Sequence, residues 1–90
     1  MSPTLRALFR LDLLRLLAKT GATGLRAESL LVELRGAGYH AATLDDVTEC
    51  VRYWCDKGRI EMVDSGAGPF AARFRVTASG HDQLDAEVRP

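Results

Sequence analysis

The order of patterns between Ala27 and Val76 constrains the fold of this chain more than any other feature. Two stretches with apolar residues at helical spacing come first, and the tripeptide Lys57-Gly58-Arg59 follows them. Two runs that alternate between apolar and polar residues come next, with a segment rich in Gly between them. This order predicts an α+β domain that is mostly helical.

A first helix is predicted from Pro3 to about Lys19, because Ser2 can cap it and Gly21 ends it. This helix has apolar residues on two roughly opposite sides, so it needs two partners. One stripe consists of Ala7, Leu11, Leu14 and Ala18, and the other of Leu5, Phe9, Leu13 and Leu16. One stripe faces the core, and the other either packs under the C-terminal segment or forms a homodimer seam. We predict the stripe that begins at Ala7 as the dimer interface, although the sequence leaves open which stripe is core.

Two shorter helices are predicted next. One covers Ala27–Arg35, and the other is capped by Thr43 and ends at Gly58, a left-handed position. Asp45 and Asp46 favour the positive end of the latter helix. The residues expected to point inward are Leu30, Leu31, Leu34, Leu44, Val47, Val51, Trp54 and Cys55.

A hairpin and a last helix complete the predicted domain. The strands are Ile60–Asp64 and Ala71–Val76, with the turn at Ser65–Pro69, and the helix runs from about His81 to Glu87. The apolar face of the hairpin consists of Ile60, Met62, Phe74 and Val76.

The expected strand pairing brings opposite charges together. If Glu61 faces Arg75 across the ladder, then Val63 faces Arg73. The connector Gly21–Leu25 is expected to add one or two residues of extended pairing to this hairpin. The hairpin would then become a sheet of two or three strands.

Length and composition bound the class of protein. Ninety residues make one domain, here 1–90, and 47% hydrophobic with 27% charged residues is typical of a soluble globular chain. Arginines and Asp12 interrupt the leucine-rich start, so neither a membrane span nor a signal peptide is expected. The cytoplasm is the expected compartment.

Residues that could support catalysis or metal binding are scattered. Cys50 and Cys55 are five apart on one predicted helix and cannot readily bridge, so they are expected to be buried thiols. His40 and His81 are isolated. We therefore expect no enzyme, no metal and no cofactor.

The charges are balanced overall but unevenly placed. Twelve Lys and Arg match twelve Asp and Glu, so the whole chain has no long-range attraction for a polyanion. Six basic and three acidic residues give residues 1–41 a charge of +3, whereas three basic and six acidic residues give residues 42–64 a charge of −3.

With these patterns, the chain resembles the winged-helix superfamily, and more loosely the small ArsR-type winged-helix proteins of Mu-like prophages. The resemblance covers roughly residues 24 to 85. The residues that carry it are Leu30, Leu31, Leu34, Gly38, Tyr39, Thr43, Leu44, Val47, Tyr53 through Glu61, Phe74 through Thr77, and Gly80. It implies a winged helix-turn-helix: a three-helix core, an antiparallel wing and a short C-terminal helix.

The resemblance also implies a transcriptional regulator that binds double-stranded DNA as a homodimer. In such proteins the helix after the turn enters the major groove, and the wing touches the neighbouring backbone. The residues of this chain at those positions are Thr43, Thr48, Arg52, Tyr53, Lys57, Arg73 and Arg75.

The chain departs from that pattern in its acidic residues. Asp45, Asp46 and Glu49 occupy the leading part of the helix, where phosphates would come close, and the wing tip has no Lys or Arg. The alternative is a protein-interaction module that docks through this acidic helix or through the leucine stripe. Trp54 is expected in the core, and Tyr53 either makes an exposed contact or covers the hairpin.

Overall fold

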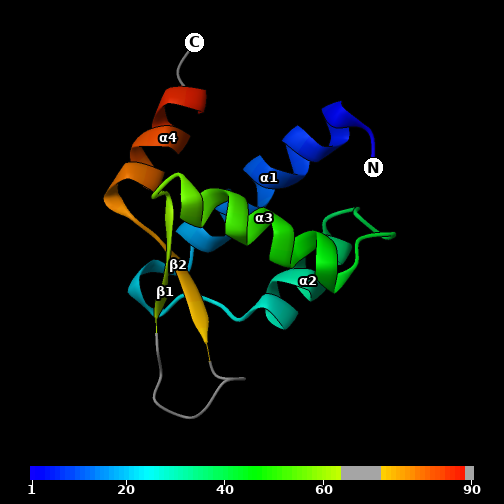
Figure 1. Cartoon of the computed structure of the whole chain (residues 1–90), viewed down its shortest axis with the longest axis horizontal. Helices are drawn as coiled ribbons and strands as arrows, with labels where there is room; N and C mark the ends of the chain where they lie inside the picture. Colours follow the sequence, from blue (N-terminus) through cyan, green and yellow to red (C-terminus); the bar gives the residue numbers. More distant parts are fainter. Residues whose placement is uncertain (64–71, 89–90) are drawn as a thin grey trace.

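The computed structural model of the chain describes residues 1–63 and 72–88, and it is α+β and mostly helical (Figure 1). The predicted hairpin tip at Ser65–Pro69 lies outside the described residues, as do the predicted strand ends at Asp64 and Ala71. The elements in chain order are α1 (Pro3–Ala18), a 3₁₀ turn η1 (Gly21–Thr23), α2 (Ala27–Gly36), α3 (Leu44–Asp56), β1 (Ile60–Val63), β2 (Arg73–Val76) and α4 (Ala78–Val88).

Helices α1, α2 and α3 pack around one apolar core, which the hairpin and α4 close from the side (Figure 1). Trp54 is in this core, as predicted, and its indole Nε1 donates a hydrogen bond to the Arg10 carbonyl at 2.9 Å. The buried side chains are Phe9, Leu13, Leu14, Leu17, Leu30, Leu34, Ala42, Val47, Cys50, Val51, Trp54, Ile60, Val76 and Leu84.

The buried face of α1 lies between the two stripes that the sequence suggests. It takes Phe9 and Leu13 from one stripe and Leu14 from the other, and it adds Leu17. The assignment of Leu14 to a dimer interface is therefore wrong. The reason is that α1 packs against α2 and β2 and also against α4, so the C-terminal segment covers part of it.

Side-chain caps fix where the helices begin. The Ser2 Oγ accepts a hydrogen bond from the Leu5 amide at 3.1 Å. At α3, the Thr43 hydroxyl accepts from the Asp46 amide at 3.2 Å, and the Asp46 carboxylate accepts from the Thr43 amide at 3.0 Å. This reciprocal pair is a capping box, which satisfies two backbone donors that the helix leaves unpaired.

We expect Thr43→Ala to lower the free energy of unfolding by about 1 kcal/mol, because it removes the cap of α3. Thr48→Ala is the matched control, since the Thr48 hydroxyl only donates back to the Leu44 carbonyl at 2.9 Å within the same helix. Urea denaturation followed by Trp54 fluorescence measures both. Equal effects of the two substitutions would show that the cap does not stabilise α3.

The hairpin has the predicted register. Glu61 pairs with Arg75 and Val63 with Arg73, and the Glu61 carboxylate forms an ion pair with the Arg75 guanidinium. The connector joins the hairpin as expected, because Leu25 and Phe74 exchange backbone hydrogen bonds of 3.0 and 2.8 Å.

Two residues expected to point inward do not. Met62 is 63% exposed, whereas Ile60 and Val76 on the same face are buried and Phe74 packs partly buried against the core. Leu44 is 41% exposed, because it is the first residue of α3 and lies at the rim of the helix packing.

The last helix begins at Ala78, three residues before the predicted start at His81. Thr77 caps it, since its hydroxyl accepts from the Gly80 amide at 3.1 Å and donates to the Gly58 carbonyl at 2.7 Å. Gly58 has the predicted left-handed conformation, with φ +72°. In the described part of the chain, no helix is both long enough and apolar enough to cross a membrane.

Candidate interaction surfaces

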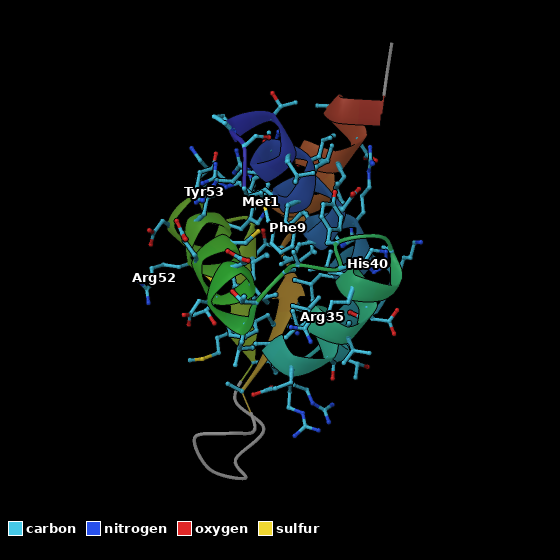
Figure 2. All side chains as sticks on the ribbon, turned by 90° about the vertical axis from the view of Figure 1, so that its right-hand side faces the viewer. Met1, Phe9, Arg35, His40, Arg52 and Tyr53 are labelled. Atoms are coloured by element: carbon cyan, nitrogen blue, oxygen red, sulfur yellow. The ribbon has the colours of Figure 1, made fainter. Side chains whose placement is uncertain are left out.

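The exposed face of α3 is the surface that a DNA-binding protein of this layout would turn to the duplex. Its outward stripe consists of Asp45, Thr48, Glu49, Arg52 and Asp56, with three carboxylates and one guanidinium. Figure 2 shows Arg52 projecting outward from α3. The Glu49 carboxylate also forms an ion pair of 3.0 Å with the Arg6 guanidinium of α1. The stripe is therefore acidic along most of its length.

The two predicted threonines use their hydroxyls within α3. Thr43 accepts the hydrogen bond of its capping box, and Thr48 donates to Leu44. Both side chains are exposed, but their polar atoms already have local partners.

Tyr53 packs against α1 through Arg10. The Arg10 guanidinium carbon lies 3.8 Å from the centre of the Tyr53 ring, and the Lys57 ammonium lies 5.1 Å from it. The ring also meets Trp54 edge-on, with 5.1 Å between ring centres. A cation over an aromatic ring is attracted by the quadrupole of the ring. Arg10 therefore occupies a face of Tyr53 that an exposed contact would otherwise use.

The two predicted wing arginines differ. Arg75 is half-buried and bound to Glu61, whereas Arg73 is exposed. Within residues 1–63 and 72–86, no carboxylate lies within 4.0 Å of Arg52, Lys57 or Arg73. These three are the predicted DNA contacts that keep an available positive charge.

A groove that the sequence patterns do not indicate is lined by residues of α1, of the C-terminal end of α3 and of α4. We call it the α1–α4 groove. It has a volume of about 510 Å³. Its lining residues are Thr4, Ala7, Leu8, Arg10, Leu11, Tyr53, Trp54, Lys57, Arg59 and Gln83.

Sequence patterns do not predict the groove, because its residues come from separate segments that only the tertiary packing brings together. One signal is visible in the sequence: Leu8 belongs to neither stripe of α1. In the structure Leu8 is 51% exposed. Ala7 is exposed as well, whereas Leu11 and Ala18 are half-buried.

The titratable groups with shifted pKa values have structural roles. The Tyr39 hydroxyl donates to the Asp12 carboxylate at 2.5 Å, and burial together with this bond raises the pKa of Tyr39 to about 12. Burial also raises the pKa of the Cys50 thiol to about 12, which keeps it protonated and unreactive. Cys55 is half-buried and its pKa is raised for the same reason. Among the described residues, no three His, Cys, Asp or Glu side chains gather as metal ligands.

Comparison of the chain with protein-family models, with curated proteins and with solved structures finds no match.

Proposed function

We propose that this chain is a winged-helix protein that binds another protein, and that α3 does not read DNA. The winged-helix assignment is supported by the order of the elements. Helices α2 and α3 are joined by a short turn, a hairpin follows α3, and Leu25 adds a third extended segment beside Phe74. Since fold alone does not determine function, the surface chemistry has to decide between the candidates.

The main observation that supports this proposal is the acidic stripe of α3. In a major groove, Asp45, Glu49 and Asp56 would approach a phosphate backbone that carries one negative charge per roughly 1.7 Å of duplex. Repulsion of this kind opposes the electrostatic attraction that supplies most non-specific affinity for DNA. The same carboxylates suit a protein partner with a basic surface, because complementary charge sets association rate and specificity.

DNA binding as a homodimeric regulator remains the second candidate. The observation in its favour is that Arg52, Lys57 and Arg73 have no carboxylate within 4.0 Å among the described residues. With Arg75 they would give four phosphate contacts. A homodimer through α1 would use Ala7, Leu11 and Ala18 without Leu14, which is buried.

Fluorescence anisotropy with a labelled duplex tests the choice at low and moderate salt. We expect no binding tighter than about 10⁻⁴ M, the weak end of non-specific binding. Salt-sensitive binding with a log–log slope of about −3.6, as four phosphate contacts would give, would instead establish the second candidate.

An Asp45→Asn, Glu49→Gln double variant is the matched control. It keeps the shape of the α3 stripe and removes two carboxylates, one of which neutralises Arg6. If the stripe is what repels DNA, this variant binds the duplex more tightly than the natural chain, and the difference shrinks as salt is added.

A further inference from the structure

We propose that the α1–α4 groove binds an amphipathic helical segment of a partner protein, with aliphatic residues on one face and carboxylates beside them. This inference rests on the proposed function as a protein-binding domain. It names a second binding surface, apart from the acidic stripe of α3, and the chemistry of the segment that fits it.

The aliphatic residues that line the groove all come from α1, and we call them its floor. Ala7, Leu8 and Leu11 line it from α1, at the spacing of successive helical turns. From Thr4 to Leu11 the helix rises by about 10 Å, so the floor matches two turns of a partner helix. Helices that dock in grooves present anchors at this same spacing of i, i+3 or i+4, and i+7. The exposed half of Leu8 is surface that such a helix would cover.

We call the basic residues that line the groove its rim. Arg10, Lys57 and Arg59 line it, and its lining includes no carboxylate. None of these three lies within 4.0 Å of a carboxylate in residues 1–63 and 72–86. The contrast on the same molecule is clear, because Arg6, Arg15 and Arg75 each have an acidic partner.

The rim cations are held in place by neutral groups. Arg10 and Lys57 lie over the Tyr53 ring. The Arg59 Nε donates to the Gln83 Oε1 at 3.4 Å, and its Nη1 donates to the Lys57 carbonyl at 3.2 Å. These contacts order the side chains without neutralising them, so the positive charge is available to carboxylates of a bound segment.

Other occupants fit this combination less well. A second copy docking through α1 would bring its own Arg10 to a rim that is already basic, and like charges across an interface are unfavourable. A nucleic acid would use the cations through its phosphates, but it would leave the aliphatic floor of Ala7, Leu8 and Leu11 uncovered. An acidic amphipathic helix uses both the floor and the rim.

The test uses a labelled designed peptide of about four helical turns, with Leu at i, i+3 and i+7 and Glu at the flanking positions. A second peptide has Lys in place of each Glu. We expect the acidic peptide to bind the full chain in the micromolar range, and the basic peptide to bind at least about tenfold more weakly. Equal binding of the two peptides would overturn the proposal.

Two variants locate the binding. Leu8→Glu should weaken the acidic peptide at least about tenfold, because it places a carboxylate on the floor. Leu5→Glu is the control, since Leu5 is also exposed on α1, at 42%, but lies outside the groove. Circular dichroism verifies that both variants fold, and equal effects of both would contradict the assignment of the groove.

A charge swap completes the test. Lys57→Glu should weaken the acidic peptide and strengthen the basic one, which a purely structural role of Lys57 would not do. Two results would show that another occupant fills the groove and that the proposal is wrong. One is a dimer, seen by sedimentation, that Leu8→Glu dissociates. The other is an oligonucleotide that competes with the peptide whether or not Leu8 is replaced. Failure of the proposed function is a separate result, because salt-sensitive duplex binding through α3 would be unchanged by Leu8→Glu.

Discussion

Replacing Leu14 with alanine is expected to lower the free energy of unfolding by about 2–5 kcal/mol, the range for a buried leucine in a packed core. The side chain has 0% exposure, so its removal leaves a cavity between α1 and the elements packed against it. In a domain whose total stability is about 5–15 kcal/mol, this loss is a large fraction. Urea denaturation followed by Trp54 fluorescence measures it, since Trp54 is buried in the same core.

Leu8→Ala is the matched control for Leu14→Ala. Both are leucine-to-alanine changes within α1, but Leu8 is 51% exposed, so its loss should change the free energy of unfolding by no more than about 0.5 kcal/mol. A Leu14 effect as small as that of Leu8 would mean that α1 is turned the other way. The stripe of Ala7, Leu11, Leu14 and Ala18 would then be restored as a dimer interface.

The contrast between these two leucines shows where sequence patterns stop being informative. Periodicity finds a helix and its ends, and here Ser2 and Thr43 cap α1 and α3 as predicted. It cannot orient a helix that is apolar on most of its circumference. The orientation of α1 is set by the elements that pack around it. These elements are α2, β2 and α4, and they come from other parts of the chain.

The hairpin was more predictable for a simple reason. The side-chain period of a strand is two, so once Glu61 is placed opposite Arg75 every other pair is fixed. What alternation does not report is how far the core extends along the ladder. Met62 shares a face with Ile60 and pairs with Phe74, yet it is 63% exposed, while Ile60 is buried in the core and Phe74 packs against it.

The candidate surfaces divide in the same way. The acidic stripe of α3 is a property of one helix, so it is visible in the sequence. The α1–α4 groove depends on Arg59 and Gln83 meeting α1 and α3, which no local pattern encodes. Resemblance to a DNA-binding superfamily directs attention to α3 and the wing, and therefore away from this groove.

The start of α4 brings Gly80 into the helix, although the sequence predicts a helix only from about His81. Its conformation does not require glycine, because its φ is not positive. The requirement is space: a Cβ at Gly80 would lie 2.2 Å from the Arg59 carbonyl oxygen and 2.5 Å from the Val76 Cγ1. Helix α4 therefore packs on the hairpin as closely as backbone atoms allow.

We therefore expect Gly80→Ala to lower the free energy of unfolding of the domain, although the same change inside a helix usually raises it by about 1 kcal/mol. Overpacking of this kind costs about 1–3 kcal/mol, because backbone atoms cannot move aside as a flexible side chain would. Gly36→Ala in α2 is the control, since no atom lies within 4 Å of its Cβ position and it should stabilise by several tenths of a kcal/mol. Urea titrations of both variants should give opposite signs. Stabilisation by both would show that α4 does not contact the hairpin, and the α1–α4 groove would then lose one of its walls.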